Sequence, residues 1–231
     1  MKNRIKDLFE SRKDNILSVF YTAGFPTIES TPLIAETLAN AGADIIEIGI
    51  PYSDPIADGP TIQESNTVAL KNGIKLSLIL NLVKDIRKTV NVPIILMGYV
   101  NPVMQYGIER FARDAAEAGV DGVILPDLPM GAYLEEYKAL FESVNLSNTF
   151  LISPTTSEER IRKIDSVTDG FIYAVSASSI TGAKGNFTDD QITYFKKLKD
   201  MKLKNPFLIG FGISNHETFS TASSYGAGAI V

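Results

Sequence analysis

The chain has 231 residues, of which 45% are hydrophobic, so it can bury one full core without a second domain. Its 22 Lys and Arg against 27 Asp and Glu give a net charge of −5, which excludes a general attraction to nucleic acid or anionic lipid. It has no Cys and one His, so disulfides, thiolate catalysis and a Cys or His metal site are not expected.

The first ten residues mix charged side chains with the apolar positions Ile5, Leu8 and Phe9, and no long apolar run follows them. This pattern is neither a signal peptide nor a membrane span, and we expect a cytoplasmic protein. Residues 1–10 predict instead an extra helix that closes the floor of the fold before the first strand begins.

Eight short apolar or β-branched runs follow, each bounded by Gly, Pro, Asn or Asp. Most are continuously apolar, as is typical of parallel strands that helices cover on the outside. Segments with helical spacing lie between them, for example Ile108, Phe111, Ala112 and Ala115. The predicted strands are 16–20, 44–50, 93–97, 122–125, 149–152, 171–175, 206–210 and 228–231.

Strand and helix therefore alternate, and capping boxes are predicted at Thr156-x-x-Glu159, Thr188-x-x-Gln191 and Ser214-x-x-Glu217. A count of eight strands favours an α/β fold of the (β/α)8 TIM-barrel type over an open sheet, and no G-x-G-x-x-G follows the first strand. We expect residues 1–231 to form one barrel domain. Because the eighth strand is predicted to reach Val231, we expect the chain to be truncated before the final loop and helix.

In such a barrel the reacting groups lie at the carboxyl ends of the strands and in the loops that follow. The second predicted strand contains Glu47 within an apolar run. Since a buried carboxylate is costly, its pKa is expected to rise toward neutrality, which suits proton transfer. The alternative is a structural Glu bonded to a neighbouring hydroxyl or backbone group.

The next loop, 51–60, is stiffened by three prolines and a glycine, and it places Asp58 where it can reach over the barrel mouth toward Glu47. Taken alone, Asp58-Gly59-Pro60 is also an ordinary turn.

Two later loops are candidates for phosphate binding. Residues 176–185 are small and polar, as in a closing loop, although many solvent-exposed loops share this composition. Residues 210–214, Gly-Phe-Gly-Ile-Ser, lead into a helix whose N-terminus can hold an anion without a basic side chain. The single histidine, His216, is expected on the surface of the first turn of that helix.

The run from Asp44 to Gln63, DIIEIGIPYSDPIADGPTIQ, closely resembles the signature of tryptophan synthase α subunits. Segments 20–26, 97–102, 126–129 and 210–214 agree with the same family in the same order, as do Ser176 and the pair Thr181-Gly182. The resemblance spans essentially the whole chain.

The resemblance implies a carbon–carbon lyase of tryptophan biosynthesis that splits indole-3-glycerol phosphate into indole and glyceraldehyde 3-phosphate by a retro-aldol step. Glu47 would be the catalytic acid and base. Asp58 would accept a hydrogen bond from the indole N–H and stabilise the positive charge that forms on the ring. Tyr173 would support Glu47.

The resemblance also assigns residues that bind the substrate. Apolar walls around the indole would come from Phe20, Met97 and Ile124. Thr181, Gly182 and Gly212 would complete the binding site, the two glycines through backbone contacts with the phosphate.

Further implications concern partners. The family works as an αββα heterotetramer in which indole passes to the β subunit. Pyridoxal phosphate is expected in that subunit, and no cofactor or metal in this one.

Two alternatives stay open. The chain could be another phosphate-binding barrel, an aldolase or isomerase, since fold does not fix function. Against this, no candidate Schiff-base Lys lies in a predicted strand, and metal-ligating histidines are missing. It could also act mainly as a partner that activates the β subunit, with weak lyase activity of its own.

Overall fold

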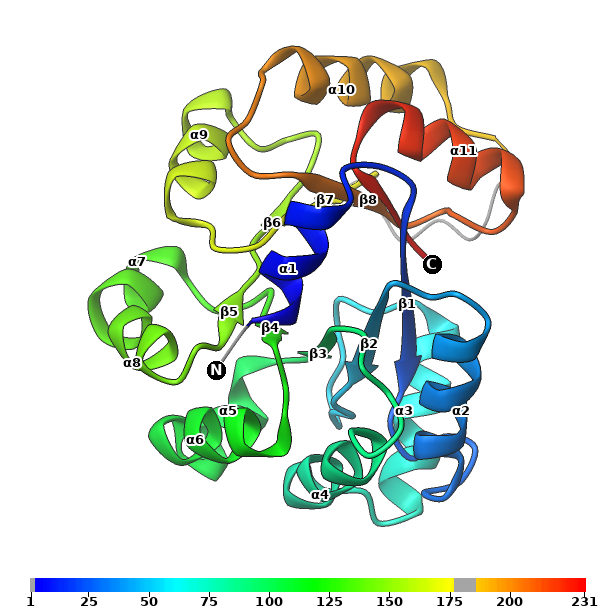
Figure 1. Ribbon diagram of the computed structural model, residues 1–231, viewed down its shortest axis with the longest axis vertical. Coiled ribbons are helices and arrows are strands. Elements are labelled where there is room, and N and C mark those ends of the chain that lie inside the picture. The colour runs from blue at the N-terminus through cyan, green and yellow to red at the C-terminus, as the bar shows by residue number, and fades with distance from the viewer. Residues whose placement is uncertain (1–2, 177–185) are drawn as a thin grey trace.

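The computed structural model describes residues 3–176 and 186–231, and its centre is a ring of parallel strands (Figure 1). Every strand pair is parallel, and the order in the sheet is β5-β4-β3-β2-β1-β9-β8-β7-β6. The strands are β1 (Ile16–Thr22), β2 (Ile45–Gly49), β3 (Ile94–Met97), β4 (Gly122–Ile124), β5 (Ser147–Asn148), β6 (Leu151–Ile152), β7 (Ile172–Val175), β8 (Phe207–Gly210) and β9 (Gly228–Ile230).

The two ends of this sheet meet in one segment of chain. Only Thr149 and Phe150 separate β5 from β6, and both residues continue the hydrogen bonding. The N–H of Thr149 donates to the Val123 carbonyl at 2.9 Å, and the N–H of Tyr173 donates to the Phe150 carbonyl at 3.0 Å. The sheet is therefore closed, and the predicted TIM barrel is confirmed. The fifth strand, predicted at 149–152, begins earlier and is interrupted in the middle.

Helices surround the strands on the outside (Figure 1), and none of the described helices is long and apolar enough to cross a membrane. In α6 the predicted apolar positions Ile108, Phe111, Ala112 and Ala115 are all buried. The outer helices are α2 (Ser30–Asn40), α3 (Pro60–Lys71), α4 (Leu76–Ile86), α5 (Val100–Tyr106), α6 (Ile108–Ala118), α7 (Met130–Ala132) with the π-helical turn η1 (Tyr133–Tyr137), α8 (Lys138–Ser143), α9 (Glu158–Val167), α10 (Asp189–Asp200) and α11 (His216–Tyr225).

The helix caps correct two of the three predicted capping boxes. The box of Thr188 and Gln191 is present at the start of α10. Helix α9, however, is capped by Ser157 rather than Thr156, and α11 by Asn215 with Thr218 rather than by Ser214 with Glu217. In both cases the cap is the next residue along the chain, Ser157 or Asn215, because that residue has the extended backbone that a cap requires.

The predicted N-terminal helix is confirmed as α1 (Arg4–Ser11), which crosses the ring of strands (Figure 1). Its buried face packs into one end of the barrel. Ile5 is fully buried, and the ring of Phe9 lies 5.6 Å from that of Phe171. Since this end is the amino-terminal end of β7, α1 closes the floor and leaves the opposite end for a site.

Candidate active site

Glu47 lies in the middle of β2 and points into the barrel. It pairs in register with Phe20 of β1 and Ile95 of β3, both of which contribute to the barrel interior. Its side chain is fully buried, and Oε1 accepts a hydrogen bond from the Ser18 hydroxyl at 2.6 Å. In the described part of the chain Oε2 has no partner. Burial raises the pKa of Glu47 to about 7, against the opposing effect of the Ser18 hydrogen bond, so both protonation states are accessible near neutral pH.

Two aromatic residues of the cavity lie near Glu47: Phe20, its register partner on β1, and Tyr173 on β7. The ring of Tyr173 leans over Gly210, where an added Cβ would lie 2.4 Å from the tyrosine Oη. Phe20 leans over Gly49 in the same way, where a Cβ would lie 2.6 Å from Cζ. Because Gly210 and Gly49 have no side chain, the rings of Tyr173 and Phe20 can occupy these positions at the ends of the strands. Burial and the nearby charge of Glu47 raise the pKa of Tyr173, which keeps the phenol protonated.

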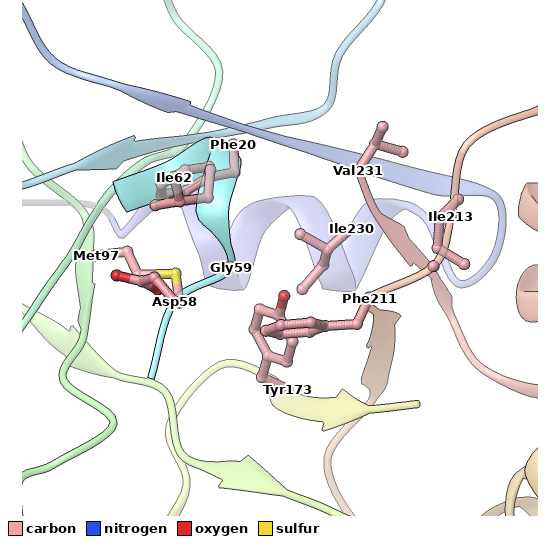
Figure 2. A pocket seen from close by; sticks show the side chains of 11 residues that line it. Phe20, Asp58, Gly59, Ile62, Met97, Tyr173, Phe211, Ile213, Ile230 and Val231 are labelled. Carbon is pink, nitrogen blue, oxygen red and sulfur yellow. The ribbon is translucent and has the colours of Figure 1, made fainter. Parts of the chain in front are cut away.

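Above these rings is a cavity of about 180 Å³ at the carboxyl ends of the strands. Figure 2 shows Phe20, Met97 and Asp58 on one side and Tyr173 and Phe211 on the other, with open space between them. A second space of about 110 Å³ adjoins it, also lined by Phe20, Asp58, Met97 and Phe211. The walls are mostly apolar and aromatic, and the arrangement suits a flat ring.

Glu47 and Ile124, by contrast, do not line either cavity. Both are fully buried inside the barrel, in register with the lining residues Phe20 and Met97 respectively. Ile124 therefore stays a predicted wall residue, next to Met97, which lines both cavities.

Asp58 reaches the cavity from the loop after β2, where it is half-buried. Its Oδ2 accepts a hydrogen bond from the Tyr99 hydroxyl at 3.3 Å, and the N–H of Ala57 donates to that same hydroxyl at 3.1 Å. The ring of Tyr52 packs 5.0 Å from that of Tyr99. Burial raises the pKa of Asp58, and the Tyr99 hydrogen bond opposes it. Tyr99 therefore ties Asp58 to its loop at the cavity edge.

The predicted phosphate loop also lies at the cavity, and Gly212 and Ile213 line it. Phe211 has a left-handed backbone, with φ of 70°, and its carbonyl accepts a hydrogen bond from Ser176 at 2.6 Å. Thr218 Oγ1 accepts from the N–H groups of Ser214 and Asn215, at 3.1 and 3.2 Å. Those two N–H groups at the start of α11 are therefore already paired.

Of the remaining predicted residues, Thr181 and Gly182 lie outside the described residues. His216 is exposed in the first turn of α11, as expected. Within residues 3–176 and 186–231, no group of three or more His, Asp or Glu side chains could hold a metal ion.

Sequence reasoning gave no role to Ser18, Tyr99 or Phe211. Ser18 was detectable, because it is a polar residue in an apolar predicted strand. Tyr99 follows β3, Phe211 follows β8, and both sit beside glycines, but nothing in the sequence shows that their side chains meet Asp58 and Tyr173.

Together, the fold and this pocket define a class: a (β/α)8-barrel enzyme with a buried carboxylate beneath an aromatic pocket. The family model described as "Tryptophan synthase alpha chain" matches residues 7–231. The chain therefore belongs to the tryptophan synthase alpha chain family, and it is a lyase of tryptophan biosynthesis.

Individual relatives agree with this assignment. The chain is 53% identical to the tryptophan synthase alpha chain of Phocaeicola vulgatus, over 99% of this chain and 89% of that one. It is 52% identical to that of Flavobacterium psychrophilum, over 99% and 90%. Among solved structures, Mycobacterium tuberculosis tryptophan synthase superposes with a TM-score of 0.90 at 31% identity, covering 100% of this chain and 89% of that one. Tryptophan synthase subunit alpha of Legionella pneumophila str. Paris gives 0.89 at 36%, covering 100% and 86%.

Proposed function

We propose that the chain performs the α reaction of its family, the cleavage of indole-3-glycerol phosphate into indole and glyceraldehyde 3-phosphate, with Glu47 moving the protons. The observation that carries the proposal is the placement of Glu47. It is a fully buried carboxyl with a pKa of about 7, directly beneath an aromatic pocket that Asp58 borders. A group of this pKa can both give and take a proton at physiological pH.

The reaction needs two proton transfers. Protonated Glu47 donates a proton to C3 of the indole ring, which leaves the ring as a cationic indolenine. The resulting carboxylate then removes the proton of the hydroxyl on the adjacent glycerol carbon. As the C–O double bond of the aldehyde forms, the C–C bond breaks and its electrons return to the ring, so indole leaves and Glu47 is protonated again.

Asp58 stabilises the ring nitrogen during this step. Its carboxylate accepts a hydrogen bond from the indole N–H and faces the positive charge that develops there. Phe20 and Met97, which line the cavity opposite Tyr173, form the apolar walls of the ring site. Since Glu47 lines neither of the two cavities in this structure, its carboxyl has to turn toward the cavity to reach the substrate.

Phosphate binding falls to backbone groups. We assign it to the N–H groups around Gly212 and Ile213, because these residues line the cavity while those of Ser214 and Asn215 are bonded to Thr218. Thr181 and Gly182 complete the site in the proposal. Backbone N–H groups hold an anion without a basic side chain, in keeping with the net charge of −5.

The proposed partner is a tryptophan synthase β subunit in an αββα assembly, with pyridoxal phosphate in the β subunit and no cofactor here. Activation of the β subunit is a second role that one observation favours. Ile56 is 80% exposed on the same loop that carries Asp58, so a protein that covers Ile56 acts directly on the position of Asp58.

The test is to supply indole-3-glycerol phosphate to the purified chain, with and without a β subunit, and to measure indole. We expect indole and glyceraldehyde 3-phosphate in equal amounts, faster with the β subunit present. Indole released in neither case would refute the lyase function. Stimulation of the β reaction without any cleavage would leave only the activating role.

A further inference from the structure

Ser18 is the polar exception on the inward face of β1. Ile16 and Phe20, two residues to either side, also point into the barrel, because side chains alternate along a strand. Ser18 itself is fully buried. Burying a hydroxyl among apolar side chains costs free energy unless the hydroxyl has a hydrogen-bond partner. The partner of Ser18 therefore accounts for a serine at this position.

That partner is Glu47. Ser18 pairs in register with Ile45, and Glu47 pairs with Phe20, so Ser18 and Glu47 are diagonal neighbours on one face of the sheet. The Ser18 hydroxyl donates to Glu47 Oε1 at 2.6 Å, a short distance for an O–H···O bond. Within residues 3–176 and 186–231, Oε2 has no hydrogen-bond partner. One hydroxyl thus holds one oxygen of the carboxyl and leaves the other free.

We propose that Ser18 is a positioning residue for the lyase reaction: its hydroxyl fixes the resting direction of the Glu47 carboxyl and stabilises the ionised form. This inference rests on the proposed role of Glu47. The free oxygen is the one that can exchange protons when the carboxyl turns toward the substrate, while Ser18 draws the carboxyl back between turnovers.

The hydrogen bond from Ser18 should change the pH at which Glu47 titrates. A hydrogen bond donated to a carboxylate favours the charged form and so lowers the pKa, in opposition to burial. Among the described residues, the titratable group that interacts with Glu47 is Tyr173 from β7. Asp58, from the loop after β2, borders the cavity that Tyr173 also lines. Neither carries a positive charge, so the Ser18 hydroxyl is the stabilising contact.

The experiment compares three variants of the full chain. Ser18→Ala removes the hydroxyl, and Ser18→Thr keeps it. Ser147→Ala is the matched control, because Ser147 is also a buried serine of the barrel, but its hydroxyl accepts a hydrogen bond from the Asn3 amide instead of donating one to Glu47. If Ser18→Ala does not fold, Ser18→Cys keeps the volume with a weak donor.

Two readouts are used. The first is kcat and kcat/KM for indole release against pH. The second is the infrared carboxyl band of Glu47 against pH, identified as the band that Glu47→Gln removes. Because the second needs no turnover, it reports on Ser18 even if the lyase function is wrong.

With Ser18→Ala we expect the midpoint of the Glu47 band, and of the limb of the rate profile that follows it, to move up by about one pH unit. We expect kcat to fall about tenfold with little change in KM, and Ser18→Thr to restore the midpoint. An unchanged midpoint in Ser18→Ala, or an equal shift in Ser147→Ala, would overturn the proposal. A shifted band without any lyase activity would support Ser18 as the contact that stabilises ionised Glu47 and reject the proposed function.

Discussion

Two of the buried carboxylates of the barrel are held in different ways. At the floor, Asp121 is 3% exposed and accepts hydrogen bonds from the side chains of Arg4 and Arg87 and from the N–H of Ile94. Nearer the mouth, Glu47 is fully buried and, among the described residues, accepts a single hydrogen bond, from the neutral Ser18. The two sites are parts of one sheet, on β2 and just before β4.

This difference separates a buried carboxylate that stabilises the fold from one that is suited to proton transfer. Asp121 is paired with the guanidinium groups of Arg4 and Arg87, and these pairs tie α1 and the end of α4 to the floor of the barrel. Glu47 has no cation beside it in the described structure, so its charge is poorly supported and its proton is easily exchanged near pH 7. If the two carboxylates differ in this way, changes at Glu47 should act mainly on activity and changes at Asp121 mainly on stability.

The largest expected effect is on catalysis. Glu47→Gln removes a group that serves in two proton transfers, so we expect indole release to fall by about 10⁴-fold. The surface variant Glu217→Gln, in the first turn of α11, should keep full activity. Circular dichroism checks folding, and substantial turnover by a folded Glu47→Gln protein would remove this carboxyl from the mechanism.

Asp121→Asn should act on stability instead. It leaves the buried guanidinium of Arg87 without its counter-charge, so we expect the free energy of unfolding to fall by about 3–5 kcal/mol. Urea denaturation measures it. Activity per folded molecule is expected to stay near that of the unchanged chain. A loss of kcat without a loss of stability would contradict the division between floor and mouth.

The pH dependence of stability gives the third test. The pKa of Glu47 is raised to about 7 in the folded chain, from 4.5, so the folded state binds more protons than the unfolded state between these values. Stability from this group is therefore full below about pH 4.5 and falls by about 3 kcal/mol as the pH rises to 7 and above. Glu47→Gln does not titrate and should lack this fall. Parallel stability curves for the two proteins from pH 4.5 to 8 would show that burial does not raise this pKa.

The smallest effect is expected at the cavity edge. Asp58→Asn keeps the size of the side chain and removes the charge that faces the ring nitrogen, so kcat should fall by about 10²-fold. Because Asp58 is half-buried, unfolding should change little. Asp54→Asn, an exposed position of the same loop, is the control. Equal losses in both variants would point to the loop as a whole rather than to Asp58.

Much of this arrangement could be predicted from local sequence. Continuous apolar runs identified the strands, and the helical spacing of Ile108 to Ala115 identified a buried helix face. Glu47 was a candidate because a carboxylate inside an apolar strand is buried away from water on either face of the sheet, which is costly unless the group is paired or functional. The interruption of the fifth strand was not predicted, since Thr149 and Phe150 make barrel contacts on both sides of the break that depend on β4 and β7.

The candidate site divides in the same way. The loop with Asp58 and the glycine loop after β8 were found from their composition and position. The contacts of Tyr99 with Asp58, and the seating of Tyr173 over Gly210, join residues far apart in the chain, so no local pattern carries them. Ile124 was expected in the wall and stays a prediction: it is buried in register with Met97 of β3, which lines the cavity.

The sequence by itself determined which helices and strands form and that Glu47 is buried, because both follow from the pattern of hydrophobic residues over a short stretch of chain. Only the tertiary structure decided that Glu47 would have one hydroxyl for support while Asp121 has two arginines. Hydrogen bonds of this kind depend on which strands and helices are brought together, and closure of the barrel sets that.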